Sequence, residues 1–282
     1  MTADTASDTP PAAAAAGAFD GQVASPRAAR GTGWGTQLLR ILVFAVILGL
    51  WQLAGGRWLP YYLISSPSDV AKTLWDLLSG SSPGLWADIE TTAEELVIGY
   101  AIGVVFGIAA GVLLGYWRVG AAIFNPLITA INGIPKIALA PLFLIWFGIG
   151  IDSKVAIASM SVFFVMFYNT YMGVSTMPQE LVNVLRIFGA SRWTVIRKVT
   201  LPQITVPLLA GMKASVPFAM IGVIVGEFIA AERGLGYLID TATQNFDSAT
   251  VFAGIVVLMV MMIIGMMLIA AIERRVLRWQ RD

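Results

Sequence analysis

The stretch PQELVNVLRIFGASRWTVIRKVTLP, residues 178–202, decides the fold, because it is a basic, amphipathic segment with very apolar runs on both sides. Apolar runs of about 20 residues are long enough to cross a bilayer. A polar helix between two such spans offers a surface that a soluble partner can bind. The sequence therefore predicts a membrane pore that is driven from outside the membrane.

The composition is that of a membrane protein. The 282 residues are 57% hydrophobic and 12% charged, and the mean hydropathy is +0.79. Soluble domains contain about 25% charged residues, and a single soluble core could not bury so much apolar surface. The net charge is +1 and the basic residues are scattered between apolar runs, which argues against a nucleic acid partner.

Two residue types that carry much enzyme chemistry are absent, because the chain has no Cys and no His. This excludes disulfides, thiol nucleophiles, histidine acid–base chemistry and metal sites with the usual zinc ligands. The sequence also lacks the G-x-x-x-x-G-K-[ST] phosphate loop and the G-x-S-x-G nucleophile elbow. We expect a non-enzymatic chain with no metal and no cofactor of its own.

The apolar runs predict an all-α integral membrane protein with six spans and a cytoplasmic helix between spans four and five. The third span is interrupted by Pro126, Pro135 and Pro141. A broken span needs protein or a water-filled path to satisfy its freed backbone groups. The expected spans are Leu38–Ala54, Thr92–Tyr116, a run that starts near Gly120, Lys154–Val174, Ile204–Ala230 and Val251–Ile272.

Four regions follow from this pattern. They are a disordered cytoplasmic tail (1–35), the first span with a periplasmic amphipathic segment (36–86), the transmembrane domain (87–275) and a basic cytoplasmic tail (276–282). The amphipathic segment should hold a short surface helix over residues 66–78, capped by Ser66 or Ser68. The first tail has too few apolar residues to order itself and lacks the pattern of a signal peptide.

The distribution of basic residues predicts that both termini and residues 178–202 are cytoplasmic. Positive charge is enriched on the cytoplasmic side of membrane proteins. Only four basic residues lie clearly outside, Arg57, Lys72, Lys154 and Arg233. Twelve lie inside: Arg27, Arg30, Arg40, Arg118, Arg186, Arg192, Arg197, Lys198, Arg274, Arg275, Arg278 and Arg281.

Glycine recurs every four residues along the second expected span, at Gly99, Gly103, Gly107, Gly111 and Gly115. This spacing lets two helix backbones approach closely in lipid. The stripe therefore predicts a helix-packing face. A second interpretation is that the smooth face lets neighbouring helices slide during gating.

The polar segment resembles the cytoplasmic loop of binding-protein-dependent ABC transporter permeases, whose pattern is E-A-A, three residues, Gly, nine residues, Ile, one residue and Leu-Pro. Gly189 is followed at these distances by Val199 and Leu201-Pro202, whereas Asn183-Val184-Leu185 replaces E-A-A. Three more blocks resemble permeases for sulfonates, taurine, nitrate and vitamin precursors: IPKIALAPLFLIWFGIGIDSK (134–154), GEFIAAERGLGYLI (226–239) and IERRVLRW (272–279).

The resemblance implies the type I ABC importer permease architecture and the import of a small polar solute from a periplasmic or extracellular binding protein. It implies a homodimer in the lipid of the bacterial inner membrane, with two copies of a cytoplasmic ATP-binding subunit. ATP and Mg²⁺ would be bound by that subunit, since this chain has no phosphate loop. In such permeases the loop forms a coupling helix that docks into a groove of the ATPase. The positions implied at that contact are Asn183, Arg186, Gly189, Ala190, Ser191 and Arg192.

Ionisable residues in the apolar runs are candidates for the translocation path, because a charge at the centre of a span costs about 2.5–3.5 kcal/mol. They are Lys136 in the broken span, Glu227 near the outer end of span five and Glu95 at the start of span two. Each could equally be a paired or interfacial charge. Glu94 and Glu95 at the outer mouth would repel an anion, which argues against an anionic solute.

Three other functions stay open at this point. An ion-gradient-driven secondary transporter would be expected to show an internal repeat and ionisable groups near the bilayer midplane. A membrane-embedded enzyme would need a cluster of catalytic groups within the spans. A structural assembly factor would show no solute-dependent ATPase activity with its partners.

Overall fold

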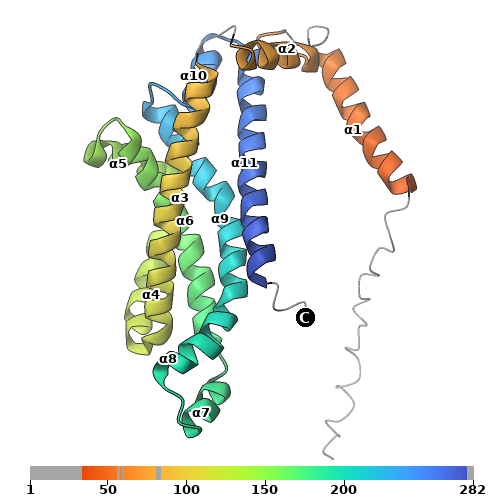
Figure 1. Ribbon diagram of the computed structural model, residues 1–282. Coiled ribbons are helices and arrows are strands. Elements are labelled where there is room, and N and C mark those ends of the chain that lie inside the picture. Colours follow the sequence, from red (N-terminus) through yellow and green to blue (C-terminus); the bar gives the residue numbers. More distant parts are fainter. Residues whose placement is uncertain (1–33, 56–57, 59, 81–83, 278–282) are drawn as a thin grey trace, which may run out of the picture. The chain divides into compact units, whose positions relative to one another are not determined.

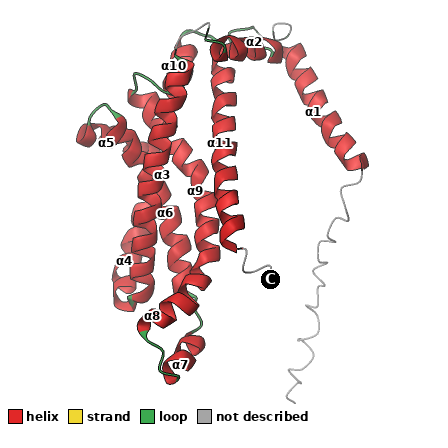
Figure 2. Ribbon diagram, in the orientation of Figure 1, coloured by secondary structure: helices red, strands yellow, loops and turns green. Residues whose placement is uncertain are grey.

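The computed structural model describes residues 34–55, 58, 60–80 and 84–277, and the regular elements among these residues are helical (Figure 2). The chain divides into two compact units, residues 1–50 and 51–282. Most of the two expected cytoplasmic tails lies outside the described residues. The α-helices are α1 Trp34–Ala54, α2 Pro67–Leu78, α3 Leu85–Tyr116, α4 Arg118–Asn132, α5 Ala140–Phe147, α6 Ile151–Ser175, α7 Gln179–Ile187, α8 Arg192–Val195, α9 Leu201–Ala230, α10 Leu235–Gln244 and α11 Ser248–Val276.

Five stretches are long and apolar enough to cross a membrane: α1, α3, α6, α11 and the run Trp193–Ala230 that contains α9. A sixth span arises if the bent pair Val119–Asn132 and Lys136–Phe147 counts as one, its two limbs meeting at 84°. The all-α membrane fold predicted from the apolar runs is therefore confirmed, and the third span is the broken one.

The break in the third span lies at Pro135, one of the three prolines predicted to interrupt it. Pro126 sits inside α4, so the prediction that it interrupts the span is wrong. The chain leaves the helix at Gly133, and a 3₁₀ turn over Lys136–Leu139 follows Pro135. Pro141 lies in the first turn of α5, where its missing N–H costs no helical hydrogen bond.

The core of the larger unit is α6, which lies between α3 and α9 (Figure 1). The glycine stripe of α3 lies along α6. A Cβ on any of its five glycines would come within 2.5–2.7 Å of an α6 atom. On the α9 side, a Cβ on Gly222 would lie 2.7 Å from the Cα of Ala158. Close packing on both sides of α6 thus depends on residues without side chains.

The two ends of the larger unit carry different short helices, with α2 and α10 at one end and α7 and α8 at the other (Figure 1). The α2 helix begins at the predicted cap, because Asp69 N donates to Ser66 Oγ over 3.3 Å. At the other end a π-helical turn, Ile196–Thr200, joins α8 to α9, and Leu201 N donates to Ile196 O. Residues 192–230 are therefore helical without interruption.

The last helix is fixed to the core by polar and aromatic contacts. Lys213 lies within the fifth span, on α9, and forms an ion pair with Glu273 of α11. The Trp51 ring lies 5.2 Å from the Phe252 ring, centroid to centroid. The ion pair holds α11 beside α9, and the ring contact joins α11 to the last turn of α1.

Candidate functional site

The segment 178–202 is anchored by a small apolar cluster of its own. Met177, Val182 and Val195 are buried together, and Leu185, Ala190 and Val199 pack around them. These side chains come from the link after α6, from α7, from the turn after it and from the run of α8 into α9. The segment is therefore a folded unit held against the ends of two spans.

A sharp turn joins α7 to α8 at the glycine that the family pattern requires. Gly189 has φ +77°, a conformation that glycine adopts without the steric cost of a Cβ. Gly189 N donates to Arg186 O and Ala190 N donates to Leu185 O, both over 2.9 Å. This pair of bonds is the Schellman ending of a helix. Ser191 Oγ then accepts from Thr194 N over 3.2 Å and caps α8.

The outer side of this turn is apolar and exposed. Ile187 and Phe188 are each 83% exposed, and Trp193 is 68% exposed. These three side chains form what we name the apolar tip. Leu181, Val184, Leu185 and Phe188 fall at helical spacing in the sequence, but α7 ends at Ile187, so Phe188 does not continue the face of this helix. The sequence signal for the tip was Gly189, because a helix that ends at a glycine turn leaves the preceding Phe188 exposed.

Most of the residues expected at an ATPase contact surround the apolar tip. Asn183, Arg186, Gly189 and Ser191 are exposed, and Ala190 is half-buried on the anchoring cluster. The side chain of Arg192 lies outside the described residues, although its backbone begins α8. The arrangement gives an apolar centre with polar and basic neighbours, which is the usual anatomy of a protein–protein interface.

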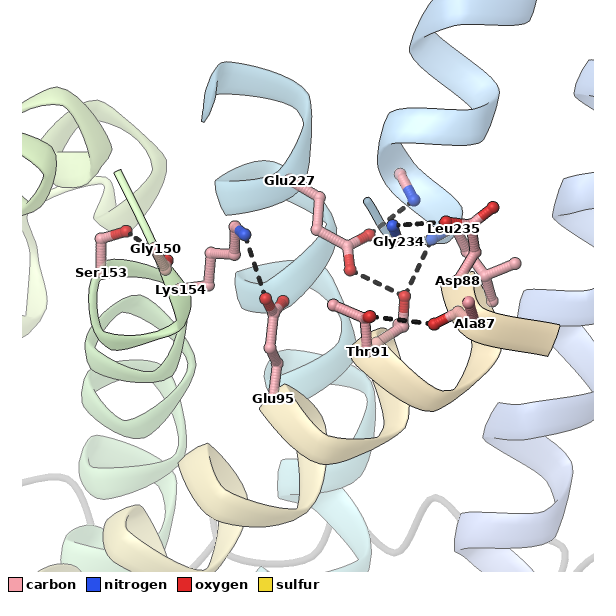
Figure 3. Close-up of polar contacts among 12 residues, drawn as sticks. Ala87, Asp88, Thr91, Glu95, Gly150, Ser153, Lys154, Glu227, Gly234 and Leu235 are labelled. Atoms are coloured by element: carbon pink, nitrogen blue, oxygen red, sulfur yellow. Dashed lines mark hydrogen bonds and ion pairs between the residues drawn. The ribbon is translucent and has the colours of Figure 1, made fainter. Parts of the chain in front are cut away.

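A buried charge cluster occupies the opposite end of the core, where α3, α6 and α9 meet (Figure 3). Lys154 Nζ lies 3.1 Å from Glu95 Oε1, and both side chains are buried. Glu95 Oε2 has no hydrogen-bond partner among the described residues. Because a buried charge without a partner is costly, the ammonium of Lys154 is what permits Glu95 to be buried.

Glu227 closes the same cluster by binding the start of α10. Its Oε2 accepts from Gly236 N over 2.5 Å, and its Oε1 accepts from Thr92 Oγ1 over 2.7 Å. Thr92 Oγ1 in turn accepts from Leu235 N over 2.9 Å. Side chains of α3 and α9 thus satisfy backbone donors that α10 cannot satisfy itself. We name this cluster, Lys154, Glu95, Thr92 and Glu227 with the start of α10, the outer latch, after the side of the membrane that the basic residues predict for it.

The structure corrects the expectation of two open carboxylates at the outer mouth. Glu94 is exposed, but Glu95 is fully buried and paired with Lys154. Neighbouring positions on a helix point about 100° apart, so one of the two faces the core. Glu95 therefore gives no argument against an anionic solute, and sequence reasoning had placed its partner Lys154 outside among the basic residues.

Lys136 begins the 3₁₀ turn at the bend of the broken span and is not part of the outer latch. Its Nζ donates to Asn132 O over 3.0 Å and to Asn132 Oδ1 over 2.8 Å, and it lies 5.0 Å from the centroid of the Phe164 ring. The ammonium is half-buried and has no acidic partner among the described residues. Among all the residues that the structure describes, no group of three or more Asp or Glu side chains could hold a metal ion.

Comparison with known proteins agrees with this geometry. The family described as "Binding-protein-dependent transport system inner membrane component" matches residues 103–278. The formylaminopyrimidine transport permease protein ThiX of Halalkalibacterium halodurans is 32% identical over 85% of this chain and 95% of its own length. The riboflavin transport system permease protein RibX of Chloroflexus aurantiacus is 31% identical over 78% of this chain and 82% of its own.

A solved structure shares the fold. A chain of the MetNI methionine ABC transporter, in an inward-facing conformation, superimposes with a TM-score of 0.56 at 19% identity, over 73% of this chain and 99% of that one. The likeness confirms the predicted type I architecture. The family match covers more than half of the chain and includes the segment 178–202. The chain therefore belongs to the family of binding-protein-dependent transport system inner membrane components, the permease subunits of ABC importers.

Proposed function

We propose that this permease moves a small polar solute from a binding protein at the outer face into the cytoplasm, driven by ATP that a separate chain hydrolyses. The observation that carries the proposal is the apolar tip of Ile187, Phe188 and Trp193, held out from the spans by a capped turn. Exposed apolar side chains on a rigid polar segment fit the role of a docking surface for a soluble partner.

The ATPase would bind around this tip. Asn183, Arg186 and Ser191 lie at its rim, and Gly189 and Ala190 set the turn, so these residues are proposed at the contact together with Arg192. Two copies of the permease would each hold one ATPase. Nucleotide binding would bring the two copies of the segment 178–202 together and tilt the spans between outward-open and inward-open states.

The opposite end, with α2 and α10, would then face outward and receive the binding protein. In this orientation both termini would lie in the cytoplasm, and the chain would lie in the inner membrane of a bacterium. It agrees with the excess of basic residues on the side of residues 178–202. The outer latch would hold α10 in place below the docked binding protein.

The path would run past the broken span. Lys136 is the charged residue best placed to meet a solute there, since its ammonium is half-buried and unpaired with any described acid. For Glu95 and Glu227 we propose a role in the outer latch, next to the path. The glycine stripe of α3 is proposed as the packing face that keeps α3 on α6.

The solute would be of the sulfonate, taurine, nitrate or vitamin-precursor type. The two relatives described above are named for the transport of formylaminopyrimidine and of riboflavin. Polar heteroaromatic compounds are therefore the first to test. An ion-gradient-driven mechanism is not favoured, because the chain belongs to a family of ABC importer subunits.

Reconstitution tests the proposal. The permease, co-expressed with its ATPase, is placed in liposomes with the binding protein, and uptake of candidate solutes is measured with ATP inside or outside. We expect uptake only when ATP is on the side of the apolar tip. Uptake that continues without ATP but stops when the ion gradient is dissipated would favour a secondary transporter instead.

A further inference from the structure

A cavity of about 690 Å³ lies against the segment 178–202. Its walls come from the ends of α3 and α6, from α4, and from α7 and α8. We name this space the inner cavity. The residues on which its chemistry depends are Ala122, Asn125, Pro126, Tyr171 and Arg186. A cavity of this size is large enough for a small ligand.

The described residues that line the inner cavity carry one positive charge and no acid. Arg186 is the only charged side chain among the described residues that line it. A guanidinium presents several N–H donors in a plane and suits carboxylate or phosphate groups. The electrostatics of this wall therefore favour an anionic ligand.

Asn125 adds a polar group whose hydrogen bonding is incomplete. Its Nδ2 donates to the Tyr171 hydroxyl over 2.7 Å, but its Oδ1 is buried and has no partner among the described residues. Buried polar atoms in proteins are nearly always hydrogen-bonded, so this acceptor needs an explanation. A ligand that offers an O–H or N–H group to Asn125 Oδ1 would supply the missing bond.

Two neighbours of Asn125 extend the same pattern. The Tyr171 oxygen accepts the Asn125 bond, which leaves its own O–H free to donate toward the cavity. Pro126 has no N–H, so it cannot give the carbonyl of Ala122 its helical hydrogen bond. The cavity wall thus presents donors from Arg186 and Tyr171 for an anion, and acceptors for a ligand that also carries a donor.

We propose that the inner cavity binds one small phosphate ester that also carries a hydroxyl group. The phosphate would lie against Arg186 and the Tyr171 hydroxyl, and the ligand hydroxyl would donate to Asn125 Oδ1. Two sources share this chemistry: the glycerol-phosphate headgroup of an anionic lipid, or a soluble phosphorylated metabolite of the cytoplasm. The assignment to the cytoplasmic end rests on the proposed function.

The position of the ligand would give it an effect on coupling. It would join α4 and α6, which belong to the spans, to α7, which carries the apolar tip. A bound anion would stabilise the arrangement in which these elements lie together, as any ligand stabilises the state it binds. Binding would therefore change the ATPase rate of the complex as well as occupying the cavity.

Direct binding to the intact permease–ATPase complex tests the inference. The complex is placed in phosphatidylcholine nanodiscs, with or without phosphatidylglycerol, and retained lipid is counted by native mass spectrometry. In a second arm, glycerol 3-phosphate is titrated into the phosphatidylcholine sample by calorimetry. The variants are Arg186→Gln and Asn125→Leu, and Arg197→Gln is the matched control, because Arg197 is exposed in the same segment and does not line the cavity.

We expect the wild-type complex to bind one phosphatidylglycerol or one glycerol 3-phosphate, with affinity about tenfold lower in Arg186→Gln and Asn125→Leu and unchanged in Arg197→Gln. Binding in the lipid arm identifies a headgroup, and binding in the soluble arm identifies a metabolite. The inference is overturned if neither ligand binds, or if all three variants weaken binding equally, which would show general surface attraction. Thermal unfolding of each variant confirms that it is folded.

The same samples separate this inference from the proposed function. A wild-type complex that imports its solute with ATP but binds neither phosphate ester contradicts the inference alone. A complex that binds the phosphate ester at Arg186 and Asn125 but shows no ATP-driven uptake with any solute contradicts the proposed function alone.

Discussion

The backbone N–H of Gly236 donates to Glu227 Oε2 over 2.5 Å, and a Cβ on Gly236 would lie 2.7 Å from that same oxygen. The missing side chain of Gly236 is thus what lets the carboxylate reach the backbone. Gly234 accompanies it, with φ +118° and its N–H donated to Asp88 Oδ1 over 2.9 Å. The sequence Gly-Leu-Gly at 234–236 is explained by the outer latch.

Substitution Gly236→Ala should destabilise the protein by about 1–3 kcal/mol, because the added methyl group overpacks a site that Glu227 fills. The measurement is the unfolding temperature of the purified permease in detergent. Gly49→Ala is the control, since a Cβ on Gly49 meets no atom within 4 Å. Equal unfolding temperatures for the two variants would contradict the outer latch.

Removing the Lys154 charge should be more damaging than removing both charges of its pair with Glu95. Lys154→Met leaves a buried carboxylate without a counter-charge, a change that costs about 3–5 kcal/mol. Adding Glu95→Gln should restore most of the lost stability. The four proteins form a double-mutant cycle, and thermal unfolding supplies the free energies. Additive losses would show that the pair does not interact.

Substitution Gly107→Ala should separate α3 from α6. A Cβ there would lie 2.6 Å from the Met166 Cβ and 2.8 Å from the carbonyl oxygen of Phe163, and a backbone atom cannot move aside cheaply. We expect a loss of about 1–3 kcal/mol in unfolding free energy. The same substitution at Gly49 serves again as reference, because Ala is a better helix former than Gly and nothing near Gly49 opposes it.

Substitution Phe188→Ala should weaken binding of the ATPase subunit by roughly tenfold or more, because exposed aromatic anchors dominate many interfaces. Its effect on unfolding temperature should be small, since Phe188 packs on little. Affinity is measured by titrating the ATPase onto immobilised permease. Trp75→Ala is the control, with an exposed aromatic residue on α2 at the opposite end. An equal loss in both variants would contradict docking at the apolar tip.

The spans and the coupling turn could be predicted because their signals are local. Apolar length, glycine spacing and the distance from Gly189 to Leu201-Pro202 are all readable along one segment. The expected helix cap at residue 66 or 68 also followed from local chemistry, and the structure selects Ser66. Of the prolines predicted to break the third span, Pro135 lies at the break but Pro126 lies inside a helix, because a proline within a membrane helix can be accommodated.

The outer latch could not be predicted because its members are distant in sequence. Thr92 and Glu227 are 135 residues apart, and Thr92 and Leu235 are 143 apart. Each residue alone resembles an ordinary helix-end charge or hydroxyl. Only the packing of α3 and α9 on α6 brings them together, and no periodicity within a single helix carries that information.

The unbroken helical path from Trp193 to Ala230 has a mechanical consequence. Its 38 residues correspond to a rod about 57 Å long at 1.5 Å per residue. A 5° change in the tilt of such a rod shifts one end against the other by about 5 Å. Small rotations imposed where the helix leaves the bilayer therefore become displacements at the far membrane surface comparable to the width of a small solute, with Pro207 and Pro217 as the points where the rod can flex.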